Sequence, residues 1–135
     1  MGEGSAAVIL LGHGSRLPEA NHGLDGVARE VAELLGGSQV EVAFLQLARP
    51  GLAEAADRCV AAGARSVAIV PFFLFAGAHV RDDIPQELER LRSRHPGIQF
   101  RVAPVLGGHP KLAEAAAERA QEAMAWESSP REAEG

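Results

Sequence analysis

The chain has 135 residues, of which 47% are apolar and 23% are charged, and its formal net charge is −5 at neutral pH. This length fits one domain with a sizeable core, and the negative balance disfavours a nucleic-acid binder, whose phosphate contacts need a basic face. The one cysteine, Cys59, cannot form an intramolecular disulfide and is expected to be a small core residue.

The chain begins with Met-Gly-Glu-Gly-Ser, which lacks the basic region and the apolar run of a signal peptide. The longest apolar stretch, 67–78, is interrupted by Pro71 and Gly77 and is too short to span a bilayer. We therefore expect a cytoplasmic protein with no membrane partner.

Four apolar runs along the chain are expected to be strands, at residues 6–11, 40–45, 67–73 and 98–105. The runs are continuous rather than alternating, which is typical of strands that are covered on both faces and therefore of a parallel sheet. Between and after them the apolar residues recur with helical period, and Gly or Pro marks the helix boundaries. The expected helices lie within residues 24–35, 52–60, 80–91 and 112–123.

This order predicts one flavodoxin-like α/β domain over residues 1–126, with a four-stranded parallel sheet and helices on both faces. The acidic segment 127–135 is expected to be disordered. We expect the strand order 2-1-3-4, because it allows helices to cover both faces. A ligand should then bind in the crevice beyond the carboxyl ends of the first and third strands.

Two loops that meet at this crevice each carry a histidine among small residues. His13 belongs to Gly-His-Gly-Ser-Arg at 12–16, and His79 belongs to Ala-Gly-Ala-His-Val-Arg at 76–81. Small neighbours leave space for a bulky ligand, and imidazole is a common ligand of Co²⁺, Ni²⁺, Fe²⁺ and Zn²⁺. Gln46, at the end of the second strand, is expected beside them. Purely structural roles for the histidines are the alternative.

Several well-known site patterns are absent from the sequence. There is no HExxH, no paired CxxC and no third nearby cysteine, which argues against a closed structural zinc site. There is no GxxxxGK[ST] loop for ATP and no Gly-x-Ser-x-Gly elbow of a serine hydrolase. The segment 12–15 has the glycines of a phosphate loop but neither its lysine nor its spacing.

Four longer segments are distinctive: Leu-Gly-His-Gly-Ser-Arg at 11–16, Ala-Phe-Leu-Gln-Leu-Ala-Arg-Pro at 43–50, Val-Pro-Phe-Phe-Leu-Phe-Ala-Gly-Ala-His-Val at 70–80, and Leu-Gly-Gly-His-Pro at 106–110. With these, the chain resembles the short CbiX/SirB type of the sirohydrochlorin chelatase family over residues 8–124. The resemblance implies a chelatase fold and an ATP-independent lyase without an organic cofactor. The implied reaction is insertion of Co²⁺ or Fe²⁺, with Ni²⁺ as a further candidate, into sirohydrochlorin for cobalamin or siroheme synthesis.

The resemblance also implies that His13 and His79 are the metal-binding and catalytic pair. We expect His79 to be both ligand and base and His13 to be the second ligand, since a neutral imidazole, with a reference pKa of about 6.5, can accept a pyrrole proton near neutral pH. Gln46 stands where the family usually has a glutamate. Its amide oxygen can coordinate a metal ion, but the side chain has no charge and cannot act as a base.

Sirohydrochlorin carries several carboxylates, and guanidinium groups bind carboxylates in a bidentate manner. The expected substrate-binding residues are Ser15, Arg16, Arg49, Gly77, Ala78 and Arg81. The aromatic run 72–75 is either a wall for the ring or ordinary core packing. His109, His95 and His22 rank lower, because they are expected in a turn, at a helix end, and in a loop or first helical turn.

The resemblance finally implies a homodimer, because larger chelatases of the superfamily contain two such halves. Two alternatives to catalysis stay open. One is a non-catalytic metal or tetrapyrrole carrier, which Gln46 favours, and the other is a flavodoxin-like module that binds a phosphorylated ligand.

Overall fold

A computed structural model describes residues 5–126, in which four parallel strands alternate with four helices. The elements are β1 (Ser5–Gly12), α1 (Pro18–Leu34), β2 (Gln39–Phe44), α2 (Leu52–Ala61), β3 (Ala64–Pro71), α3 (Ala78–Arg94), β4 (Gln99–Val102) and α4 (Pro110–Ala125). The strand order β2-β1-β3-β4, with every neighbouring pair parallel, confirms the expected topology. No helix in the described part of the chain is long and apolar enough to cross a membrane.

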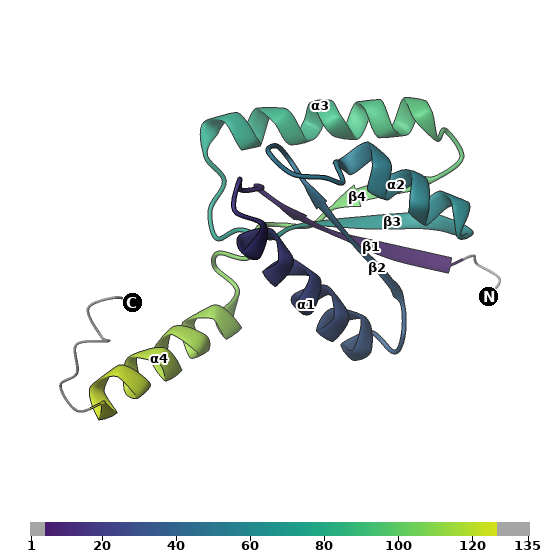
Figure 1. The fold of residues 1–135 in the computed structure, drawn as a ribbon. Coiled ribbons are helices and arrows are strands. Elements are labelled where there is room, and N and C mark those ends of the chain that lie inside the picture. Colours follow the sequence, from purple (N-terminus) through teal and green to yellow (C-terminus); the bar gives the residue numbers. More distant parts are fainter. Residues whose placement is uncertain (1–4, 127–135) are drawn as a thin grey trace.

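One face of the sheet is covered by α2 and α3, which lie on the same side in Figure 1. Alternate strand residues such as Ile9, Ile69 and Phe100 point to this face and are fully buried. They pack with Leu91 of α3 and Cys59 of α2, whose burial confirms that the thiol is a core residue. This cluster is the main core of the domain.

The opposite face is covered only in part. There α1 packs on β1 and β2, where Leu24 and Ala28 contact the cluster that contains Leu10, Val42 and Phe44. The half of this face that belongs to β3 and β4 has no helix over it among residues 5–126. The last helix, α4, contacts no other element of the described chain and extends away from the sheet in Figure 1.

Several boundaries differ from the sequence expectation for local reasons. α1 begins at Pro18 rather than near Leu24, because proline is favoured at the first helical position, where its missing N–H is not needed. His22 therefore lies within the helix, in its second turn. β4 ends at Val102 rather than at 105, since Pro104 has no N–H for the ladder. β3 likewise ends at Pro71, and the expected disordered tail, 127–135, lies outside the described residues.

Candidate functional site

The loops after β1, β2 and β3 meet at the carboxyl edge of the sheet. Backbone hydrogen bonds continue past the strands, from the N–H of Gln46 to the carbonyl of His13 at 3.1 Å and from the N–H of Phe72 to the carbonyl of Leu11 at 2.7 Å. The structure therefore confirms that the first and third loops are neighbours and that Gln46 lies beside His13. The Gln46 side chain itself is exposed.

The close approach of the first two loops requires a glycine at position 14. Gly14 has φ +98°, and a Cβ built on it would lie 1.7 Å from the carbonyl oxygen of Gln46. An L side chain is thus excluded by both backbone conformation and space. The small residue beside His13 brings the two backbones into contact and does not merely leave room for a ligand.

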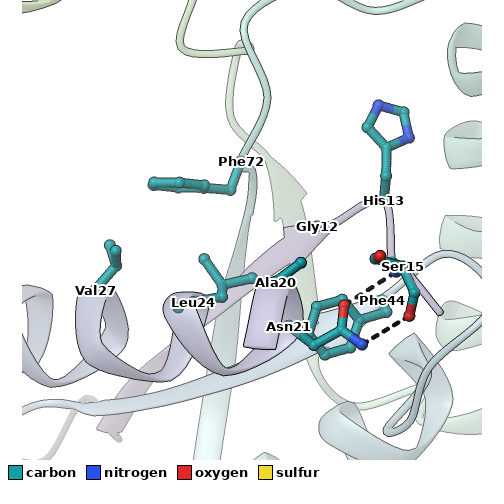
Figure 2. A pocket seen from close by; sticks show the side chains of 11 residues that line it. Gly12, His13, Ser15, Ala20, Asn21, Leu24, Val27, Phe44 and Phe72 are labelled. Carbon is teal, nitrogen blue, oxygen red and sulfur yellow. Dashed lines mark hydrogen bonds between the residues drawn. The ribbon is translucent and has the colours of Figure 1, made fainter. Parts of the chain in front are cut away.

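The imidazole of His13 is exposed and packs against the ring of Phe73, with a centroid separation of 4.3 Å and an interplanar angle of 32°. In Figure 2 the ring points away from α1 and from the neighbouring Ser15. The imidazole is thus packed against an aromatic ring of the β3–α3 loop. Within residues 5–126 the ring nitrogens of His13 form no hydrogen bond, so both are available to a ligand.

A cavity of about 400 Å³ adjoins His13 and lies between the β1–α1 loop, the first turns of α1, Phe44 and Phe72 (Figure 2). Of the expected site residues, His13 and Ser15 line this cavity, whereas His79 and Gln46 do not. The structure thus places His13 on the β1–α1 loop and His79 in the first turn of α3, and only His13 borders this cavity.

Asn21 fixes the conformation of the β1–α1 loop and was not among the expected site residues. The backbone N–H of Ser15 donates to its Oδ1 at 3.0 Å, and its Nδ2 donates to the carbonyl of Ser15 at 2.8 Å. The hydroxyl oxygen of Ser15 in turn accepts from the N–H of Leu17 at 3.0 Å. Ser15 therefore stabilises the turn, while its hydroxyl proton is free to donate to a ligand. The signal for Asn21 in the sequence was only an amide one turn after Pro18.

His79 is the second residue of α3, after the extended Gly77 and after Ala78. The first backbone N–H groups of a helix have no partner within it, and this end carries the positive pole of the helix dipole. The residues 77–79 therefore offer a favourable position for an anionic group. The side chain of His79 is exposed.

The three expected arginines differ in how free they are. Arg16 and Arg81 are exposed and form no ion pair within the described part of the chain. Arg49 is paired with Glu54 of α2, and the hydrogen bond from its guanidinium is the main cause that lowers the pKa of that carboxyl to about 2. The N–H of Gly51 adds a hydrogen bond of 2.9 Å to Glu54, so this carboxylate also caps α2.

The lower-ranked histidines have structural contacts. His95 follows α3 at the amino-end edge of the sheet, where its Nε2 lies 2.8 Å from Oδ1 of Asp57 on α2. His109 is the N-cap of α4, and its Nδ1 accepts from the N–H of Lys111 at 3.1 Å. Both placements agree with the low rank given to these residues.

Large apolar side chains are exposed around the carboxyl edge, on all three loops that carry the candidate residues. We call these four residues the apolar rim: Leu17, Leu47, Leu74 and Phe75. Phe75 is 76% exposed, whereas Phe72 and Phe73 are half-buried, so the aromatic run divides between rim and packing. Large apolar side chains that are exposed at one edge of a sheet favour a binding surface there.

Within residues 5–126, no three or more His, Cys, Asp or Glu side chains are grouped to hold a metal ion. The two histidines at the edge thus belong to no group of three or more such side chains in the described part of the chain. A closed metal site of four protein ligands is not formed here.

The sequence matches the family model described as CbiX over residues 7–123. A sirohydrochlorin cobaltochelatase of Priestia megaterium is 35% identical over 90% of this chain and 39% of its own length, and the chloroplastic sirohydrochlorin ferrochelatase of Arabidopsis thaliana is 34% identical over 87% and 52%. A cobaltochelatase of Sulfurisphaera tokodaii is 31% identical over 87% of this chain and 92% of its own length.

Solved structures with the same fold include a CbiX protein from Marinobacter aquaeolei VT8, with a TM-score of 0.78, 31% identity and coverage of 88% of this chain and 97% of that one. SirB from Bacillus subtilis, solved with Fe³⁺, gives a TM-score of 0.77 at 29% identity and covers 85% of this chain and 46% of that one. The chain thus spans about half the length, or less, of several of these relatives.

Proposed function

This chain belongs to the CbiX family, and we propose that it is an ATP-independent chelatase that inserts Co²⁺ or Fe²⁺ into sirohydrochlorin. One observation carries the proposal. His13 and His79, two exposed histidines, lie in the loop after β1 and in the first turn of the helix after β3. These strands are parallel neighbours, and ligands bind such sheets beyond the carboxyl ends of the strands. Relatives named as sirohydrochlorin cobaltochelatases and ferrochelatases support the choice of substrate and of metal.

In the proposed reaction the two imidazoles bind the incoming ion while it loses water. Because residues 5–126 contain no group of three or more His, Cys, Asp or Glu side chains that could hold a metal ion, the ion keeps open positions for the nitrogens of the macrocycle. A site with few protein ligands also releases the ion to a tetradentate ring more readily than a closed site would. Two pyrrole protons leave as the divalent ion enters the ring. Each imidazole has one basic nitrogen, and once that nitrogen has released the ion it can accept one of the two protons near pH 7.

The surroundings of the histidines suit an anionic, flat macrocycle. The apolar rim provides surface for the ring, and the free guanidinium groups of Arg16 and Arg81 bind its carboxylates. The start of α3, at Gly77 and Ala78, and the hydroxyl of Ser15 add hydrogen-bond donors. Arg49 joins them only if it gives up its contact with Glu54.

We further propose that the chain acts as a homodimer in the cytoplasm. The chain covers 39% of the Priestia relative and 46% of the Bacillus SirB structure, so two copies match the size of one such protein.

A tetrapyrrole or metal carrier is the second candidate, and Gln46 is the observation that favours it. Its backbone lies beside His13, where a carboxylate would add charge and basicity that an amide lacks. A protein with this substitution can bind ring and ion and yet transfer protons slowly.

The deciding experiment is an anaerobic absorbance assay of sirohydrochlorin with Co²⁺ or Fe²⁺. We expect native protein to accelerate metallation and His13→Ala and His79→Ala each to reduce the rate about 100-fold, the lower range for loss of a general base. His22→Ala is the matched control, since His22 is exposed on α1 and should leave the rate unchanged. Gln46→Glu should raise the rate if the missing carboxylate limits proton transfer.

A native rate equal to that of sirohydrochlorin without protein, combined with tight binding of the ring, would contradict catalysis and favour the carrier. If His13→Ala and His79→Ala both metallate sirohydrochlorin at the native rate, neither histidine takes part in the mechanism.

A further inference from the structure

The imidazole of His13 has no hydrogen bond that could orient it. A histidine that binds a metal ion normally donates its second ring N–H to a carboxylate or a carbonyl, which holds the ring in position. Within residues 5–126 neither ring nitrogen of His13 has such a partner. Packing against Phe73 is a contact between ring faces and does not select the direction of a nitrogen. That direction therefore depends on the backbone that carries the ring.

This backbone is attached to the β2–α2 loop at one end. The N–H of Gln46 donates to the carbonyl of His13 at 3.1 Å, and Gly14 lies directly against the carbonyl of Gln46. These contacts hold residues 13 and 14 but not the segment 15–17, through which the chain turns into α1. A second attachment of the loop is needed on the side of the helix.

Asn21 provides this attachment. It is the fourth residue of α1, it is half-buried, and its amide is directed at Ser15 (Figure 2). Its Oδ1 accepts from the N–H of Ser15 at 3.0 Å, and its Nδ2 donates to the carbonyl of Ser15 at 2.8 Å. One side chain thus holds the peptide groups on both sides of Ser15, which fixes their orientation as well as their distance from the helix.

The needs of α1 do not explain an asparagine at this position. Asparagine is favoured at a helix N-cap but is a poor helix former at interior positions. The N-cap of α1 is Leu17, and Asn21 lies inside the helix, on the wall of the cavity beside His13. Its two polar atoms are directed out of the helix, toward the loop that carries His13.

We propose that Asn21 is a positioning residue for metal insertion, which acts through Ser15 to hold the loop that presents His13 to the ion. The inference rests on the proposed function, because it takes His13 as a ligand of the metal substrate. With the loop fixed in advance, its ordering does not have to be offset when the ion binds. Loss of a group that orients a metal ligand typically costs 10–100-fold in metal affinity or in activity.

The first test replaces Asn21 and measures binding of Co²⁺ alone to the whole chain by titration calorimetry. Asn21→Leu keeps the bulk of the side chain and removes both hydrogen bonds, whereas Asn21→Ala also removes the bulk. We expect both variants to bind Co²⁺ at least about 10-fold more weakly and to lose a similar factor in kcat for metallation. The KM for sirohydrochlorin should change less, because the expected ring-binding arginines lie elsewhere. His22→Ala, at the next and exposed position of α1, is the control and should match native protein.

The second test asks whether the amide acts through His13. The effect of Asn21→Leu on Co²⁺ affinity is measured in native protein and in His13→Ala. If Asn21 positions the imidazole, the amide has no effect once the imidazole is absent, so His13→Ala and the double variant should agree within about twofold. The same loss in both backgrounds would contradict the inference, because it would mean that Asn21 supports the fold in general.

Two further outcomes separate this inference from the proposed function. Native Co²⁺ affinity and native kcat in Asn21→Leu would overturn the positioning role and leave His13 as a ligand. If His13→Ala itself bound Co²⁺ as tightly as native protein, the proposed metal site would be wrong, and the role of Asn21 would fall with it.

Discussion

Around Gly14 the backbone of the β1–α1 loop passes directly against the carbonyl of Gln46. Replacement by alanine forces a left-handed conformation on an L residue and moves the two loops apart. We expect Gly14→Ala to lower the free energy of unfolding by about 2 kcal/mol or more, within the range for strained backbone positions. Urea denaturation followed by circular dichroism measures the change.

Gly26 provides the matched control for this substitution. It lies in the middle of α1, where a Cβ would meet only the end of the flexible Arg29 side chain at 4.0 Å. Alanine is the better helix former, so Gly26→Ala should stabilise the protein by about 0.5–1 kcal/mol. Similar losses for both variants would mean that the approach of the two loops is not the cause.

At the scale of single residues, the sequence predicted positions better than contacts. The adjacency of His13 and Gln46 follows from the strand order, which was expected because it allows helices to cover both faces of the sheet. The clamp of Asn21 on Ser15 depends on the exact turn between β1 and α1, which no pattern specifies. The Arg49–Glu54 pair was also missed, although a glutamate three residues after Gly51 is a recognised signal of helix capping.

Among the helices, α2 and the end of α3 are joined by a polar cluster. Asp57 accepts two hydrogen bonds from the guanidinium of Arg94, at 2.8 and 2.6 Å, and lies 2.8 Å from Nε2 of His95. The hydrogen bond from Arg94 is the main cause that lowers the pKa of Asp57 to about 2, from 3.8. The cluster attaches two helices to each other on the fully covered face of the sheet.

A carboxyl with a lowered pKa in the folded state stabilises the protein above its unfolded pKa, and this contribution is lost as pH falls through the folded value. For Asp57 the loss should extend from about pH 4 to about pH 2. Asp57→Asn should therefore reduce the unfolding free energy at pH 7 by no more than about 1 kcal/mol, since the pair is partly exposed. Denaturation of both proteins between pH 7 and pH 2.5 should show the difference shrinking toward zero.

Asp25→Asn is the control that removes a carboxylate without removing an ion pair. Asp25 is exposed on α1 and forms no ion pair in the described chain, so the change should stay within about 0.5 kcal/mol. A difference between native protein and Asp57→Asn that is the same at pH 7 and pH 2.5 would argue against the ionised pair.

The elements themselves were largely predictable, because continuous apolar runs and helical periods are local properties of the sequence. The errors lie where a backbone rule outweighs hydrophobicity. Pro104 ends β4 although Val105 continues the apolar run, and Pro18 starts α1 although its first turn is polar. Proline supplies both effects through its missing N–H and its fixed φ angle.

For the whole molecule, periodicity showed that the last helix has an apolar side but not which surface it meets. That surface depends on the β4–α4 connection, whose path is determined by long-range contacts of Leu106 and Gly107 with the β3–α3 loop. The expected parallel sheet with helices on both faces is confirmed. In the described residues, however, α4 does not cover the β3 and β4 half of the face on which α1 lies.

The main core between α2, α3 and the sheet should become accessible to solvent only when the whole domain unfolds. The reactivity of the Cys59 thiol can measure this opening. Its side chain is fully buried between α2 and the sheet, and burial raises the pKa of the thiol to about 11. Both effects suppress reaction with a thiol reagent at pH 8, because the thiolate is the reactive form.

We expect labelling of native protein to be at least about 1,000-fold slower than in urea-unfolded protein, which corresponds to an opening free energy of about 4 kcal/mol or more. If opening is global, Gly14→Ala should speed the labelling by the factor that its loss of unfolding free energy predicts. Rapid labelling of native protein, or a rate that Gly14→Ala leaves unchanged, would mean that α2 detaches from the sheet on its own.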